Sequence, residues 1–118
     1  MSSYNGSCHC GTVKFTFTLR APIEEQEVVN CNCSICTKNG YLMVYPKVSE
    51  TTFNHPEDAV RTYYHATKRF PHFFCVNCGT SVYAKGPEGT DFMAVNARTI
   101  EGIEIEKLKL KPMDGRSL

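Results

Sequence analysis

The sequence lacks an excess of charge of either sign. Its 13 lysine and arginine residues nearly balance its 12 aspartate and glutamate residues, which leaves a formal net charge of +1. The basic residues are spread along the chain and form no stripe. Because nucleic acids and anionic membranes are bound through such stripes, we expect neither of them as a partner.

The sequence also lacks a long apolar segment. The longest stretch of this kind, residues 41–45, is far too short to cross a bilayer. Residues 1–7 are polar and contain no apolar segment of the kind found in secretion signals. We therefore expect an intracellular protein without a membrane partner, located in the cytoplasm, with the nucleus left open as a second compartment.

The length and composition are those of a small folded domain. The chain has 118 residues, of which 42% are hydrophobic and 21% are charged. These proportions are typical of soluble globular proteins and differ from those of disordered chains. We predict that residues 1–118 form one zinc-binding domain with a modest core.

A convincing helical period is absent, and an alternating pattern takes its place. Residues 12–19 carry apolar side chains at every second position, which predicts a half-buried strand. Single helical turns are expected around 34–38 and 104–108, and residues 113–118 are expected to fray. The pattern indicates a small, mainly β fold of antiparallel sheets held by metal. Its further expected strands are residues 27–30, 41–45, 60–65, 70–74, 81–84 and 92–97, of which the last four form two hairpins.

Cysteine is abundant, with seven residues in this short chain. An odd count without a secretion signal argues against a framework of disulfides. Cys8 and Cys10 are separated by one residue, as are Cys31 and Cys33, and such close neighbours rarely meet disulfide geometry. Metal binding is the better interpretation.

The cysteines form three clusters, of which the first and third are each followed by glycine. A Cys-x-x-Cys-Gly turn forms a zinc knuckle, in which the glycine supplies the unusual φ that closes the turn. Pairing the two outer clusters gives a closed site of four thiolates, and the middle cluster then lacks a fourth protein ligand. Because catalytic zinc keeps an open position whereas structural zinc does not, we predict one zinc ion of each kind. The structural ligands are Cys8, Cys10, Cys75 and Cys78, and the catalytic ligands are Cys31, Cys33 and Cys36.

Two alternatives stay open at this point. In the first, a histidine completes the second site, so that both zinc ions are structural. In the second, Cys31 and Cys33 pair with the knuckle formed by Cys75 and Cys78. The candidate histidines are His9, His55, His65 and His72.

The three clusters, in this order, resemble the glutathione-dependent formaldehyde-activating enzyme family, which also includes the centromere protein V-like domains. The matching stretches are residues 6–15, 31–40, 74–80 and 95–100. The resemblance implies the same division of the cysteines between two zinc ions, with glutathione acting near the second ion. It also implies a tent-like fold of stacked antiparallel sheets and a carbon–sulfur lyase activity that forms or cleaves S-hydroxymethylglutathione.

The chemistry of a three-thiolate zinc ion is consistent with such an activity. An external thiol that takes the open position loses its proton, and the thiolate can then add to a small carbonyl such as formaldehyde. Glutathione is the expected small-molecule partner. Candidate contacts to its carboxylates or to an oxyanion are Lys38, Asn39, Arg69 and Arg98.

The alternative function is that of a non-catalytic, zinc-stabilised protein-interaction module. Aromatic side chains near the third cysteine cluster would then form the contact surface. These residues are Tyr63, Tyr64, Phe70, Phe73 and Phe74.

Overall fold

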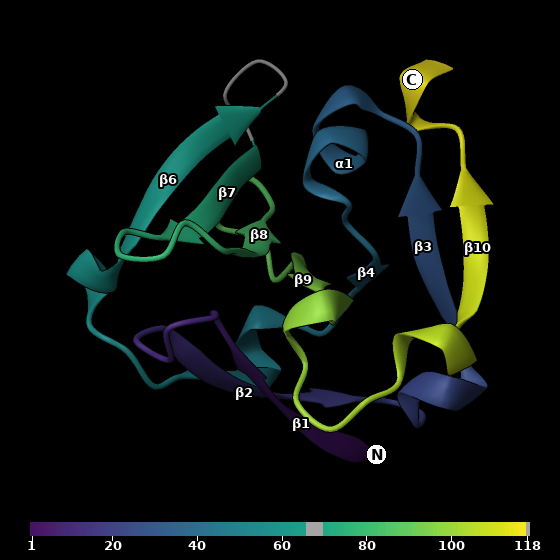
Figure 1. The fold of residues 1–118 in the computed structure, drawn as a ribbon, viewed down its shortest axis with the longest axis horizontal. Helices are drawn as coiled ribbons and strands as arrows, with labels where there is room; N and C mark the ends of the chain where they lie inside the picture. The colour runs from purple at the N-terminus through teal and green to yellow at the C-terminus, as the bar shows by residue number, and fades with distance from the viewer. Residues whose placement is uncertain (66–69, 118) are drawn as a thin grey trace.

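A computed structural model describes residues 1–65 and 70–117, without the side chain of His65. Within this part of the chain there are ten strands and one short α-helix (Figure 1). The expected turn at 66–69, which contains Arg69, lies outside the described residues. The elements are β1 (Ser2–Ser7), β2 (Lys14–Leu19), β3 (Glu27–Cys31), α1 (Ser34–Asn39), β4 (Met43–Val44), β5 (Thr51–Phe53), β6 (Val60–His65), β7 (Phe70–Cys75), β8 (Ser81–Lys85), β9 (Met93–Asn96) and β10 (Lys109–Met113).

Short 3-10 turns connect several of these elements, and none of the described helices is long and apolar enough to cross a bilayer. The helical turn predicted around 34–38 is present as α1, and the one predicted around 104–108 is the 3-10 turn η5. The turns are η1 (Ile23–Glu25), η2 (Val48–Glu50), η3 (Glu57–Ala59), η4 (Ala97–Thr99), η5 (Ile105–Lys107) and η6 (Gly115–Ser117).

The strands form two sheets. Strands β1, β2 and β5 make a three-stranded sheet, which lies below the larger sheet in Figure 1. The larger sheet has the order β10-β3-β4-β9-β8-β7-β6. The two predicted hairpins are confirmed, because β6 pairs with β7 and β8 pairs with β9, both antiparallel. The predicted mainly β fold class is therefore confirmed.

The core follows from the alternation of side chains along the strands. In β2, Phe15, Phe17 and Leu19 are buried, as the period of two predicts. In the larger sheet, Val28 belongs to the main core whereas its neighbour Val29 belongs to a second, smaller cluster. Successive side chains point to opposite faces, so the larger sheet packs on both faces. Cys31, Ile35 and Cys36 pack against the smaller cluster.

The end of the chain differs from the expectation in two ways. Residues 113–118 were expected to fray, but Met113 ends β10 and Gly115–Ser117 form a 3-10 turn, while Leu118 lies outside the described part. The sheets were expected to be antiparallel throughout, but β10 pairs with β3 in parallel. The two differences are linked, because the Asn32 N–H donates to the Met113 carbonyl at 3.0 Å and the last residues are thereby held where the edge strand β10 pairs with β3.

Candidate metal centres and the adjoining cavity

Four cysteines from distant parts of the sequence meet at the end of β7. Cys8 and Cys10 follow β1, Cys75 ends β7 and Cys78 lies in the turn after it. Their sulfur atoms all lie within 4.8 Å of one another. The Cys8–Cys10 and Cys10–Cys75 sulfur separations are 3.6 and 3.7 Å. A tetrahedral zinc ion with Zn–S bonds of about 2.3 Å requires sulfur atoms about 3.8 Å apart, so this group fits such an ion.

Backbone N–H groups point at the sulfur atoms of this group. The Val13 N–H donates to the Cys8 sulfur at 3.2 Å. The Asn77 and Cys78 N–H groups donate to the Cys75 sulfur at 3.4 and 3.5 Å. Such donors favour the thiolate form, which is the form that binds metal.

Hydrogen bonds to two threonine hydroxyls lower the pKa values of two cysteines in this group and so also favour the thiolate form. A hydrogen bond from Thr80, at 3.2 Å, lowers the pKa of Cys78 to about 5. The hydrogen bond between the Cys10 sulfur and the Thr12 hydroxyl, also at 3.2 Å, lowers the pKa of Cys10 to about 7. Burial raises the pKa of Cys75. Cys78 and Cys10 therefore form thiolates at lower pH than Cys75 does.

Each of the two turns in this group contains a glycine in the left-handed region. Gly11 has a φ of 83° and Gly79 a φ of 80°. These glycines follow Cys10 and Cys78, as the sequence predicts for knuckle turns. A side chain at either position would strain the turn that brings the sulfur atoms together.

Replacing Gly79 with alanine is expected to lower the free energy of unfolding by about 1–2 kcal/mol and to weaken metal retention. A Cβ atom at this position would meet no atom within 4 Å, so the cost comes from the backbone alone. The matched control is Gly89→Ala in the β8–β9 hairpin, where φ is 88° and space is equally open. Denaturant unfolding and chelator competition would measure both effects. Equal metal retention in the two variants would contradict the role assigned to the Gly79 turn.

The remaining three cysteines meet where β3 leads into α1. Cys31 ends β3, Cys33 is the residue before α1, and Cys36 lies in its first turn. Their sulfur atoms lie within 4.8 Å of one another, and the Cys33 N–H donates to the Cys31 sulfur at 3.4 Å. All three side chains are half-buried. The structure therefore brings the seven cysteines together as groups of four and three, and not in the alternative division.

The pKa shifts of Cys33 and Cys36 reflect the crowding of sulfur atoms in this group. Burial raises the pKa of Cys36, and the neighbouring Cys33 and Cys31 raise it further. Burial also opposes ionisation of Cys33, but hydrogen bonds from Cys36 and Cys31 lower its pKa overall. Three thiolates this close repel one another without a cation between them. The donor set, three sulfur atoms and no carboxylate, suits zinc better than magnesium or calcium.

Among the described side chains, no histidine joins the group of three. The exposed His9 lies beside the other group, where its backbone N–H donates to the Thr80 hydroxyl at 3.2 Å. The ring of His55 bonds to the Tyr83 hydroxyl at 3.0 Å. His72 stacks on Tyr41 with ring centroids 5.7 Å apart. The alternative of a histidine ligand thus finds no support in the described side chains, from which that of His65 is missing.

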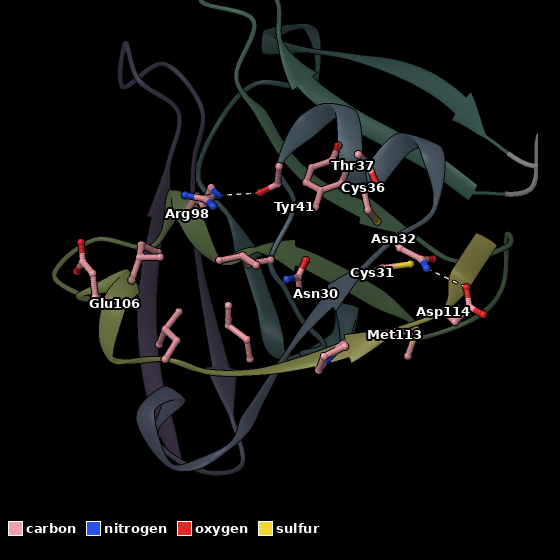
Figure 2. A pocket seen from close by; sticks show the side chains of 16 residues that line it. Asn30, Cys31, Asn32, Cys36, Thr37, Tyr41, Arg98, Glu106, Met113 and Asp114 are labelled. Carbon is pink, nitrogen blue, oxygen red and sulfur yellow. Dashed lines mark hydrogen bonds between the residues drawn. The ribbon is translucent and has the colours of Figure 1, made fainter. Parts of the chain in front are cut away.

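The group of three opens into a cavity of about 800 Å³, shown in Figure 2. Cys31 and Cys36 line this cavity, whereas no cysteine of the other group does. Its polar side chains are Asn30, Asn32, Thr37, Arg98, Glu106 and Asp114. Its apolar side chains are Leu42, Ile105, Leu108, Leu110, Pro112 and Met113, with Tyr41 between the two sets.

Arg98 lies across the cavity from the two sulfur atoms (Figure 2). Its Nε donates to the Gly40 carbonyl at 2.7 Å, which fixes one edge of the guanidinium. In residues 1–65 and 70–117, no carboxylate lies within ion-pair distance of Arg98. A guanidinium held in this way presents its remaining donors to an anionic ligand, and a carboxylate matches them best.

Asn32 joins the cavity wall to the end of the chain. Its amide donates to an Asp114 carboxylate oxygen at 2.9 Å, and the Arg116 N–H donates to the Asn32 side-chain oxygen at 2.9 Å. Gly115 lies so close to Cys31 that a Cβ atom there would collide with its sulfur. Neither Asn32 nor this segment was among the site residues predicted from the sequence. The alternation of lysine with leucine over 107–111 was the signal that predicts strand β10.

Of the three described polar residues predicted to contact substrate, Arg98 alone is among those that line the cavity. Lys38 is exposed on α1 and absent from the lining. Asn39 instead holds α1 in place, because its amide donates to the Ile35 carbonyl at 3.2 Å and its oxygen accepts from Ser81 at 3.1 Å. Arg69 lies outside the described residues. Arg98 is thus the predicted contact that the structure places at the cavity.

Known proteins are similar to this chain in sequence or in fold. A Schizosaccharomyces pombe protein described as an uncharacterized lyase is 27% identical over 106 residues, which cover 88% of this chain and 73% of that protein. The crystal structure of a Rhodobacter sphaeroides protein matches with a TM-score of 0.77 at 22% identity and covers 91% of this chain and 99% of that one. It shows the same fold. The family model described as glutathione-dependent formaldehyde-activating enzyme matches residues 3–114. Because this match spans nearly the whole chain, the protein belongs to the glutathione-dependent formaldehyde-activating enzyme family.

Proposed function

We propose that this protein is a zinc-dependent carbon–sulfur lyase that forms or cleaves the glutathione adduct of formaldehyde. It holds two zinc ions, a structural one at Cys8, Cys10, Cys75 and Cys78 and a second one at Cys31, Cys33 and Cys36. The observation that carries the proposal is the cavity, which is lined by sulfur ligands of the second group and by none of the first. Family membership and the lyase description of the yeast relative support it.

The different roles proposed for the two zinc ions follow from their numbers of cysteine ligands. Cys31, Cys33 and Cys36 would hold the second zinc ion, which would favour the thiolate form of a thiol bound to it. In the forward direction the glutathione sulfur forms a bond to the carbonyl carbon, the C=O π bond breaks, and the carbonyl oxygen takes up the proton that the thiol released. Cleavage is the reverse. No electrons are exchanged with an outside donor or acceptor.

The cavity residues orient the tripeptide. Arg98 binds one of the glutathione carboxylates, because its guanidinium is fixed by Gly40 and carries no other charge partner among the described residues. Asn30 lies between Arg98 and Cys31 in Figure 2 and offers its amide group to the peptide bonds of the substrate. The polar side of the cavity is therefore assigned to glutathione.

X-ray absorption at the zinc edge tests the proposal directly. With four and three cysteine ligands, the mean number of sulfur neighbours per zinc should rise from three and a half to four when glutathione is added. An unchanged sulfur count would refute glutathione as the ligand. Formaldehyde release from S-hydroxymethylglutathione, compared with the rate without protein, is the accompanying activity measurement.

Replacing Arg98 with glutamine is expected to weaken glutathione binding about ten-fold or more, because a charge-assisted hydrogen bond to a carboxylate is lost. Zinc content should stay at two ions per chain. The matched control is Arg61→Gln, since Arg61 is exposed on β6 and does not line the cavity. Isothermal titration calorimetry measures both variants. Equal glutathione affinities of Arg98→Gln and Arg61→Gln would show that Arg98 is not part of the proposed site.

A second candidate function is a non-catalytic, zinc-stabilised interaction module. The observation that favours it is the exposure of Tyr63 and Tyr64 on β6, which are 60% and 55% exposed. Phe73 and Phe74, on the neighbouring strand, are only half-buried. A purified protein that binds no glutathione, or that holds a single metal ion, would favour this function over the enzymatic one.

A further inference from the structure

Asn32 lies between two cysteines of the group of three, and all of its polar groups bond to residues at the end of β10 and just after it. Its backbone N–H donates to the Met113 carbonyl at 3.0 Å, and its side-chain amide donates to an Asp114 carboxylate oxygen at 2.9 Å (Figure 2). Its side-chain oxygen accepts from the Arg116 N–H at 2.9 Å, and its carbonyl accepts from the Arg116 guanidinium at 3.4 Å. One segment thus holds both the backbone and the side chain of the residue that joins two sulfur ligands.

The segment that holds Asn32 is itself fixed by further contacts. The Ser117 hydroxyl donates to the second carboxylate oxygen of Asp114 at 2.6 Å, and Met113 is opposite Cys31 in the parallel pair of strands. Hydrogen bonds from Ser117 and Asn32 lower the pKa of Asp114, so its carboxylate is charged at neutral pH. Hydrogen bonds to a charged acceptor are stronger than those between neutral groups. Asn32 is therefore bound to a firm partner.

The backbone of the same segment lies directly against two of the sulfur ligands. A Cβ atom at Gly115 would collide with the Cys31 sulfur and would lie 3.2 Å from the Cys33 Cβ. Gly115 is not among the described glycines in the left-handed region, so the close approach requires glycine here and the backbone conformation does not. The cavity, by contrast, is lined by Cys31 and Cys36. The segment therefore covers one side of the group, and the cavity reaches another.

We propose that residues 113–117 form a clamp that sets the positions of Cys31 and Cys33 for metal binding. Its positioning residues are Asn32, Asp114 and Gly115. The inference deepens the proposed function, since it rests on the second metal group. Three thiolates this close repel one another, so the backbone around them must be fixed if they are to stay in the arrangement that a metal ion needs. The clamp fixes this backbone through a residue pair that is 82 positions apart in the sequence.

Replacing Asn32 with aspartate is expected to weaken metal binding by the second group about ten- to hundred-fold, because it sets a second carboxylate against that of Asp114. Asn32→Asp combined with Asp114→Asn exchanges donor and acceptor, and the Arg116 N–H and the Ser117 hydroxyl each keep an acceptor. This double variant should restore the metal affinity to within about three-fold of the wild type. Competition with a chromophoric chelator measures the zinc affinity. The visible absorption of the cobalt-substituted protein reports whether the sulfur ligands still surround the ion.

The matched control for the added carboxylate is Ser49→Asp. The Ser49 N–H and hydroxyl donate to the two carboxylate oxygens of Asp91 at 2.8 and 2.6 Å, and this pair also joins distant segments. Neither residue lines the cavity or belongs to a sulfur group. Ser49→Asp should therefore lower the unfolding midpoint but leave the metal affinity and the cobalt spectrum unchanged.

A second pair of variants tests the close approach of the backbone. Gly115→Ala is expected to weaken metal binding by the second group about ten-fold or more, because the added methyl group displaces a sulfur ligand. The matched control is Gly86→Ala, where a Cβ atom would lie 2.7 Å from the Thr90 hydroxyl oxygen and is just as crowded, but touches no sulfur ligand. It should change stability alone.

An unchanged metal affinity of the second group in Asn32→Asp would overturn the inference. So would a double variant that binds metal no better than Asn32→Asp, or the same metal affinity in Gly115→Ala and Gly86→Ala. These measurements need no glutathione, which separates them from the proposed function. A wild type that binds two metal ions but no glutathione would refute the proposed function and keep the clamp. Wild-type metal affinity in the clamp variants, together with glutathione binding, would refute the clamp and keep the proposed function.

Discussion

Replacing Cys78 with serine is expected to abolish the cooperative unfolding transition of the protein. The Cys78 sulfur belongs to the group that ties the segment after β1 to the end of β7. A structural zinc site contributes apparent binding energy of about 10–16 kcal/mol, which matches or exceeds the whole stability of a small domain, about 5–15 kcal/mol. Serine is a poor ligand for zinc, so most of this energy is lost. Thermal and denaturant unfolding followed by circular dichroism would show a broad change without a midpoint.

Two controls separate metal loss from a general effect of substitution. Thr80→Val removes the hydroxyl beside the Cys78 sulfur but leaves all four sulfur ligands in place, so it should keep a cooperative transition. Treatment of the wild-type protein with a strong chelator should reproduce the behaviour of Cys78→Ser. A Cys78→Ser protein that unfolds cooperatively at the wild-type midpoint would contradict the structural role of this group.

Replacing Cys36 with serine is expected to have the opposite profile, with loss of one zinc ion and of glutathione binding but with a preserved fold. Cys36 packs against the smaller cluster on the outer face of the larger sheet, and the main core does not include it. Native mass spectrometry should therefore count two zinc ions in the wild type and one in Cys36→Ser. Calorimetry with glutathione should show affinity reduced by at least about a hundred-fold, since the thiolate loses its metal.

The comparison between the two cysteine variants is the decisive one. Unfolding of Cys36→Ser should remain cooperative, with a midpoint close to that of the wild type. Equal destabilisation by Cys36→Ser and Cys78→Ser would mean that both metal ions are structural. Retention of glutathione binding by Cys36→Ser would mean that the tripeptide binds elsewhere in the chain. Either result would favour the interaction module over the enzyme.

The parts of the fold that the sequence predicted are those with a local signal. The alternation over residues 12–19 and the turn residues at 86–89 directly predict β2 and the β8–β9 hairpin. The cysteine groups were predictable for a related reason. A knuckle turn with its glycine has a fixed local geometry, and simple counting of ligands then pairs two clusters and leaves the third open.

The cavity was not predictable, because it depends on contacts between distant segments. Arg98 was one of four cationic or polar candidates, and its position at the cavity depends on a hydrogen bond to Gly40, 58 residues away in the sequence. Strand β10 was missed, although its lysine and leucine residues alternate. Its side chains stay exposed at the edge of the sheet, and the prediction of a fraying end overrode the pattern. Parallel register with β3 carries no local sequence signal of its own.

The parallel pairing of β10 with β3 has a consequence for the order of folding. Asn32 and Asp114, which hold the two strands together at the cavity, are 82 residues apart in the sequence. Contacts of such separation require the closure of a long loop, and they form late and slowly in folding. The four-sulfur group closes a loop of similar length, since Cys10 and Cys75 are 65 residues apart, but the binding of a metal ion offsets the cost of closing it. A refolding chain is thus expected to become a compact, metal-bound intermediate first, and to gain the ability to hold substrate only in a later and slower kinetic phase.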